Sequence, residues 1–169
     1  MQNIEIKAVY QDFDFAKSVI AKLGGDFYSS LEQKDVYFNV RNGRMKLRFL
    51  NENEGYLVHY ERANESGPKS SYYEIFHAEP PDELQKLLEP ALGVRAVVKK
   101  KRDVYLIDNV RVHLDEVETL GRFLEFEAVL DENQNAADER EKLGRYMQEF
   151  KISEDSLVED SYLDLLLNR

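Results

Sequence analysis

Apolar and polar residues alternate at spacing two along several segments, a period that is typical of strands with two different faces. This alternation, together with β-branched and aromatic content, predicts strands at 4–10, 36–40, 44–50, 56–62, 70–77, 96–108, 110–117 and 123–130. Turn signals such as Asn42-Gly43 separate neighbouring strands. Because turns, rather than crossover helices, link most of them, we expect an antiparallel sheet that closes or nearly closes into a barrel.

Apolar residues at helical spacing predict helices at both ends of the chain and one between the strands. Residues 12–23 begin with a capping Asp12 and end at Gly24-Gly25, and residues 82–92 follow Pro80-Pro81 and end at Gly93. Residues 134–150 and 160–167 complete the helical set. The expected fold is therefore α+β: eight antiparallel strands with helices packed outside, in a single domain over residues 1–169.

Composition narrows the function classes. The chain has no cysteine, which excludes disulfides and thiolate metal sites, and its net charge of -10 argues against an exterior that binds nucleic acid. No apolar run is long enough to cross a bilayer, and the polar start of the chain does not resemble a signal peptide. We therefore expect a cytoplasmic protein without nucleic-acid or membrane partners, and a homodimer is one assembly that we consider.

Charged side chains at spacing two occupy one face of six predicted strands. One interpretation is that these are the solvated faces of a sandwich. The other is that the faces turn inward and line a polar lumen, in which basic side chains neutralise phosphates and carboxylates hold Mg²⁺ or Mn²⁺. The inward set would comprise seven cations, Lys7, Lys46, Arg48, Arg62, Lys100, Arg102 and Arg111, and four acids, Glu5, Asp115, Glu125 and Glu127. Lys99 and Lys101 would then point outward.

The same residues resemble a known family. Asn3-Ile4-Glu5-Ile6-Lys7 is similar to the N-terminal Glu-x-Glu-x-Lys signature of CYTH proteins, also called triphosphate tunnel proteins. The resemblance continues, in order, through residues 35–38, 42–48, 97–105, 112–127 and 160–166, and is most specific in 112–127. That stretch looks closest to the bacterial branch that resembles class IV adenylyl cyclases.

The resemblance implies an eight-stranded antiparallel tunnel that binds a triphosphate such as ATP with Mg²⁺ or Mn²⁺. It implies metal ligands at Glu5, Glu125 and Glu127, and phosphate binders at the seven cations named above. It also implies catalytic roles for Glu5 and Lys7, with Asp115 in support of the metal ligands and counted with the catalytic group.

Three activities remain open at this point. The first is adenylyl cyclisation of ATP to cyclic AMP and pyrophosphate, and the second is hydrolysis of inorganic, thiamine or nucleoside triphosphate. The third is a non-catalytic sensor of nucleotide or polyphosphate, because Asn3 stands where the family signature has its first acid. His113 is a candidate base or a supporting residue.

Overall fold

The computed structural model describes residues 2–62, 69–130 and 135–169; the side chains of residues 2, 62 and 69–71 fall outside that description. The strands are β1 (Gln2–Val9), β2 (Asp26–Phe38), β3 (Arg44–Phe49), β4 (Gly55–Arg62), β5 (Lys69–Ala78), β6 (Val94–Ile107), β7 (Val110–Val117) and β8 (Gly121–Leu130). The helices are α1 (Phe13–Lys22), α2 (Pro81–Leu92), α3 (Ala136–Glu149) and α4 (Tyr162–Leu167), with a short 3₁₀ turn at Glu154–Ser156.

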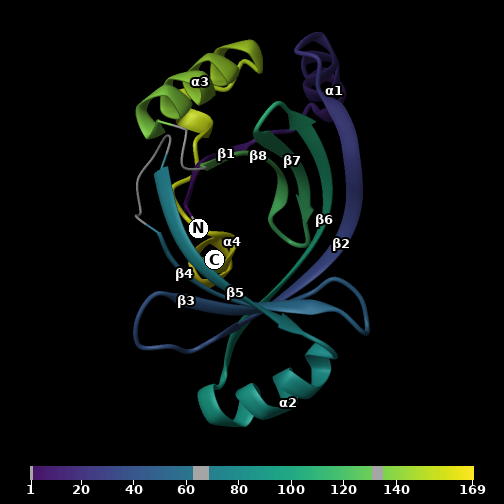
Figure 1. The fold of residues 1–169 in the computed structure, drawn as a ribbon, viewed down its shortest axis with the longest axis vertical. Coiled ribbons are helices and arrows are strands. Elements are labelled where there is room, and N and C mark those ends of the chain that lie inside the picture. Colours follow the sequence, from purple (N-terminus) through teal and green to yellow (C-terminus); the bar gives the residue numbers. More distant parts are fainter. Residues whose placement is uncertain (1, 63–68, 131–134) are drawn as a thin grey trace.

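All eight strands pair antiparallel, in the order β1-β5-β4-β3-β2-β6-β7-β8, and β1 also pairs with β8. The strands therefore surround a common interior (Figure 1). The β1–β5 contact that completes the ring is short, with four registered pairs between residues 2–5 and 69–72. The predicted eight-stranded antiparallel α+β architecture is confirmed.

The outer face of the sheet is its apolar face. Ile4, Ile6 and Phe126 are fully buried there beneath α1 and α3, in one cluster with Ile20 and Phe150. Each such side chain contributes about 1.5–3 kcal/mol by leaving water, which holds the helices against the sheet. Figure 1 shows α1 and α3 together at one end of the molecule. With the apolar face committed to the helices, the polar face of the same strands is turned inward.

The other two helices lie elsewhere. Helix α2 covers the opposite end, where its Leu84 and Leu88 pack on Val36 and Leu47 of β2 and β3 (Figure 1). Helix α4 instead packs among the strands, and its Tyr162 and Leu163 join a cluster with side chains of β2, β4, β6, β7 and β8. The end of the chain therefore contributes to the interior of the sheet.

Most predicted boundaries agree with the structure, and Asp12 caps α1 by accepting a hydrogen bond from the Phe15 amide at 2.9 Å. The exception is β2, which begins at Asp26, whereas the sequence predicted a strand only from Val36. Its first half is rich in polar residues that gave no β signal, and pairing with β6 along nearly its whole length holds it extended. Among the described residues, no helix combines the length and apolar character that a bilayer crossing requires.

Candidate functional site

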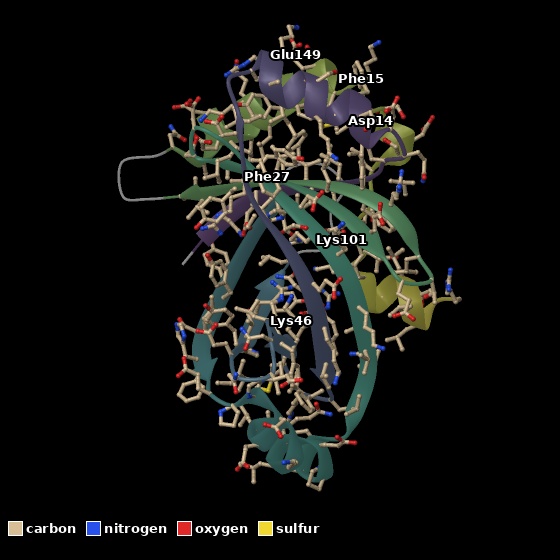
Figure 2. All side chains as sticks on the ribbon, turned by 90° about the vertical axis from the view of Figure 1, so that its right-hand side faces the viewer. Asp14, Phe15, Phe27, Lys46, Lys101 and Glu149 are labelled. Atoms are coloured by element: carbon tan, nitrogen blue, oxygen red, sulfur yellow. The ribbon has the colours of Figure 1, made fainter. Side chains whose placement is uncertain are left out.

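A cavity of about 360 Å³ lies inside the ring of strands. Lys46 of β3 lines this cavity and is labelled in Figure 2 between the surrounding strands. Lys101 of β6, labelled in the same figure, does not line it. The cavity is lined by nine of the predicted site residues: Glu5, Lys7, Lys46, Arg48, Lys100, Arg102, Arg111, Glu125 and Glu127. The side chain of Arg62 lies outside the described residues. Lys99 and Lys101 are exposed, as the alternation predicted.

A wider and shallower surface groove of about 810 Å³ adjoins the cavity and shares Gln33 and Lys100 with it. Lys100 is the one predicted site residue among the described residues that line the groove. The rest of its charged lining mixes lysines, glutamates and Arg122, and this mixture of signs favours neither an anion nor a cation. The chemistry is therefore concentrated in the smaller interior cavity.

Two arginines in the cavity are each held by a buried carboxylate. Arg48 donates to Asp35 through Nε and Nη2, both at 2.7 Å, and Lys46 donates to the same carboxylate at 3.2 Å. Burial raises the pKa of Asp35, but Arg48 and Lys46 lower it by more, so it lies well below the ordinary value. Arg48 thus has a fixed orientation in the cavity wall before any ligand arrives.

The second pairing has the same form. Arg102 donates through Nε and Nη2 to the fully buried Asp115 at 2.7 and 2.6 Å, and the Tyr162 hydroxyl donates to Asp115 at 2.7 Å. Burial raises the pKa of Asp115, whereas Arg102 and Lys100 lower it below its ordinary range. Both oxygens of Asp115 are therefore engaged behind the cavity wall.

We call the glutamate side of the cavity, formed by Glu5, Glu125 and Glu127, the acidic wall. Glu125 contacts Lys7 Nζ at 3.6 Å and His113 Nδ1 at 3.2 Å. Burial raises the pKa of Glu125, but the hydrogen bond with His113 and the charge of Arg102 leave it well below its ordinary value. The other imidazole nitrogen lies 3.8 Å from Glu127, so His113 bridges two carboxylates, which suits a supporting role.

The acidic wall offers the donor chemistry of a hard cation site. Glu5 and Glu127 lie opposite each other on β1 and β8, and the Asn3 amide nitrogen donates to Glu127. The amide oxygen of the buried Asn3 has no hydrogen-bond partner among the described residues. Carboxylate and amide oxygens suit Mg²⁺ or Mn²⁺, so the residues fit such an ion by type. In the part of the chain that the structure describes, however, no three acidic or imidazole groups converge on one point.

The buried lysines lie against tyrosine rings. Lys7 Nζ and Lys100 Nζ lie 4.2 and 5.0 Å from the ring centroid of Tyr162. Lys46 Nζ lies 5.8 and 5.6 Å from the rings of Tyr37 and Tyr60. Lysine cations therefore reach the cavity from β1, β3 and β6, each beside an aromatic face.

Burial also changes how readily two of these lysines ionise. Burial and the charge of Arg48 lower the pKa of Lys46 to about 8. Burial and the charge of Arg102 lower the pKa of Lys100 well below its ordinary value. The Arg111 side chain is 50% exposed, and its Nη1 lies 3.5 Å from a Glu127 carboxylate oxygen.

The residues in or beside the cavity that sequence reasoning did not assign to the site include Gln33, Asp35 and Tyr162. Gln33, Asp35 and Tyr37 do alternate at spacing two, but the predicted strand began at Val36 and left the first two out. Tyr162 comes from a six-residue helix, for which no period in the sequence indicates a place inside a barrel.

The amino-acid sequence is similar to those of known proteins along most of its length. The model of the CYTH domain family matches residues 1–162. A Methanocaldococcus jannaschii protein called a "putative adenylate cyclase" is 27% identical to this chain. The alignment is 172 residues long and covers 98% of each chain.

Solved structures show the same fold. The PH1012 protein of Pyrococcus horikoshii superimposes with a TM-score of 0.84 at 26% identity, over 96% of this chain and 98% of its own. A Hippeastrum adenylyl cyclase homologue, described as having a dominant triphosphatase activity, gives 0.68 at 15% identity, over 98% and 95%. Since the family model spans nearly the entire length, the chain belongs to the CYTH domain family.

Proposed function

We propose that this protein binds a nucleoside triphosphate in the interior cavity and, with Mg²⁺ or Mn²⁺, converts ATP to cyclic AMP and pyrophosphate. The observation that carries the proposal is the gathering of basic side chains from four strands around one cavity of about 360 Å³. Six cations line it, namely Lys7, Lys46, Arg48, Lys100, Arg102 and Arg111. Carboxylates of the protein pair with several of these cations, but the buried Lys100 has no ion pair among the described residues, so the cavity retains positive charge for an anion.

The chain's own residues divide the work by type. Arg48 and Arg102 are held in place by Asp35 and Asp115 and supply fixed positive charge for the phosphates. Lys46 and Lys100 provide ammonium groups from the same two strands as these arginines, and Lys7 provides one from β1. Because Asp115 is engaged by Arg102 and Tyr162, we assign it the role of orienting Arg102 in place of the catalytic role expected from the sequence.

The acidic wall would take the divalent ion. Its candidate ligands are Glu5, Glu127 and the Asn3 amide oxygen. Glu125 could also bind the ion if it gave up its contacts with Lys7 and His113. When bound, such an ion neutralises phosphate charge and lowers the pKa of a coordinated hydroxyl. In the cyclisation, the ribose 3′-hydroxyl gives up its proton to solvent and its oxygen forms a bond to the α-phosphorus. The bond between the α-phosphorus and the oxygen that bridges it to the β-phosphorus breaks, and pyrophosphate leaves with that oxygen.

Triphosphate hydrolysis is the second candidate. It uses the same cavity, with water in place of the ribose hydroxyl and the terminal phosphorus as the point of attack. The resemblance in fold to the Hippeastrum protein described as a triphosphatase supports keeping it. The two activities share the binding step and differ in their products.

Calorimetry with tripolyphosphate and with ATP, each with and without Mn²⁺, tests the binding step. Lys46→Met should weaken tripolyphosphate binding by about 10-fold or more, since it removes a buried charged donor. Lys101→Met, which removes an exposed lysine, is the matched control and should leave the affinity unchanged. Absence of binding by the wild type, or equal losses in both variants, would refute the proposal.

Product analysis tests the reaction. Chromatography of ATP incubated with Mn²⁺ and the protein should show cyclic AMP and pyrophosphate in equal amounts. ADP with phosphate would favour the triphosphatase instead. Tight binding without turnover would leave the protein a sensor and contradict both enzymatic proposals.

A further inference from the structure

Tyr162 occupies a special place among the aromatic residues of the cavity, because two lysines from different strands lie against its ring. The ammonium nitrogens of Lys7 on β1 and Lys100 on β6 are 4.2 and 5.0 Å from the ring centroid. Tyr162 is 4% exposed, and it lines the cavity together with Ser161. The last helix of the chain therefore supplies a wall of a site that is otherwise built from strands.

Contacts other than those with the two lysine ammonium groups fix the position of this ring. Helix α4 begins with a capping box, in which Ser161 and Asp164 exchange hydrogen bonds, and Asp164 pairs with Arg44 of β3 at 2.6 Å. Just before the helix, the Val158 amide donates to the Lys7 carbonyl at 2.9 Å. The ring also packs edge-on against Phe123 at 5.1 Å between centroids. It is thus a rigid surface that is present before any ligand binds.

Lys100 shows what this surface does. Its side chain is buried, yet among the described residues it forms no ion pair with a carboxylate within 4.0 Å. The neighbouring carboxylate, Asp115, gives both oxygens to Arg102 and Tyr162 instead. An aromatic face attracts an ammonium group but accepts no conventional N–H hydrogen bond as a carboxylate does. A lysine held in this way keeps its donors for an incoming anion, and no ion pair has to be broken first.

We propose that Tyr162 is a positioning residue for the phosphates: its ring, which also contacts Lys7, places Lys100 at the cavity wall without neutralising it, and its hydroxyl orients Asp115 behind Arg102. The inference rests on the proposed triphosphate-binding function and assigns to the C-terminal helix a part in it. The alternative is that Tyr162 only fills space in the cluster with Leu163 and Phe123.

Two substitutions separate ring from hydroxyl and from simple packing. Tyr162→Phe keeps the aromatic face and should bind tripolyphosphate within about threefold of the wild type, whereas Tyr162→Leu should bind about 10-fold more weakly. Leu163→Ala is the matched control, since Leu163 is buried in the same cluster. Its truncation should weaken the packing of α4 while leaving the Tyr162 ring in place. Its affinity should stay at the wild-type level. Equal affinities for Tyr162→Leu and the wild type, or a loss in Leu163→Ala as large as in Tyr162→Leu, would overturn the proposal.

A double-mutant cycle shows whether the ring acts through the lysine. In a Lys100→Met background, Tyr162→Leu should weaken binding by less than the 10-fold or so expected in the wild type, because one of the two cations that the ring holds is already gone. Fully additive losses would show that Tyr162 does not act through Lys100. Equal losses for Tyr162→Phe and Tyr162→Leu would show that the ring contributes nothing.

A ligand-free measurement separates this inference from the proposed function. In NMR spectra, the ε-methylene protons of Lys100 should be shifted upfield by the Tyr162 ring, retained in Tyr162→Phe and lost in Tyr162→Leu. Absence of that shift in the wild type would overturn the inference even where tripolyphosphate binds. A wild type that shows the shift but binds no tripolyphosphate would refute the proposed function, and with it the phosphate-positioning role.

Discussion

The two halves of the basic cavity hold their cations in different ways. Arg48 and Arg102 each form a two-pronged pair with a buried aspartate, at 2.6–2.7 Å. Lys7 and Lys100 instead lie over the Tyr162 ring, at 4.2 and 5.0 Å. We refer to these as the carboxylate-paired arginines and the ring-contacting lysines. Lys7 also lies 3.6 Å from Glu125, whereas Lys100 has no ion pair among the described residues. The difference teaches that inward-facing charge serves two ends: the arginine pairs hold the walls together, and Lys100 remains available to a ligand.

Breaking an arginine pair should have the largest effect on the fold. Asp115→Ala leaves Arg102 as a buried cation without its main partner, which costs about 3–5 kcal/mol of unfolding free energy. Urea denaturation measures this loss. Glu116→Ala, which removes the adjacent exposed partner of Arg122, is the control and should cost less than about 1 kcal/mol. Similar losses in the two variants would mean that the buried pair has no special role.

Removing a ring-contacting lysine should have the opposite profile. Lys100→Met deletes a buried charge that has no ion pair among the described residues, so the unfolding free energy should stay equal or rise. Tripolyphosphate affinity should fall by about 10- to 100-fold, the contribution expected of hydrogen bonds to a charged group. Lys101→Met, on the exposed face of the same strand, should change neither quantity. A Lys100→Met variant that is destabilised yet binds normally would reverse the assignment of the two groups.

Lys46 combines the two kinds of contact, because it pairs with Asp35 and also lies near the rings of Tyr37 and Tyr60. Changing the pH tests how its charge affects ligand affinity and stability. Its pKa is lowered to about 8, so the ammonium loses its proton in the folded state as pH rises through that value. Tripolyphosphate affinity should therefore fall by about 10-fold between roughly pH 7.5 and 9.5. An unfolded lysine keeps its proton to a pH of about 10.4, so over this window the unfolded state binds more protons than the folded state. The contribution of Lys46 to the free energy of unfolding therefore rises with pH.

The conservative variant checks the source of that pH dependence. Lys46→Arg stays charged throughout the range, so calorimetry at several pH values should show a much flatter affinity profile. Lys101→Arg should retain the wild-type profile. An unchanged slope in Lys46→Arg would assign the titration to another group.

The comparison also shows what the sequence can and cannot predict. Alternation at spacing two correctly separated Lys100 and Arg102 from the exposed Lys99 and Lys101, because the period follows from strand geometry alone. It could not predict which carboxylate holds which cation. Asp35 and Asp115 approach Arg48 and Arg102 through register across neighbouring strands, which depends on the whole sheet. Tyr162 reaches Lys7 only because the chain end folds back onto β1, a contact over more than 150 residues of sequence.

The smallest expected effect comes from a substitution beside the acidic wall. Asn3 stands where CYTH signatures carry an acid, so Asn3→Asp restores that charge. The Asn3 amide nitrogen donates to Glu127, while its oxygen has no partner among the described residues. Asn3→Asp replaces the donor with a second charge beside Glu127, so without metal the variant should unfold at a slightly lower temperature. A divalent cation would relieve that repulsion. We therefore expect Mn²⁺ to raise the melting temperature of Asn3→Asp more than that of the wild type, with about a threefold lower half-saturating Mn²⁺ concentration. Tripolyphosphate affinity without metal should change little, since the Asn3 side chain donates to Glu127 and the substitution removes none of the cavity's cations. Asn3→Ala, which removes both the amide donor and its oxygen, should gain no Mn²⁺ response. Overlapping Mn²⁺ titrations for Asn3→Asp and the wild type would show that this position does not limit metal binding.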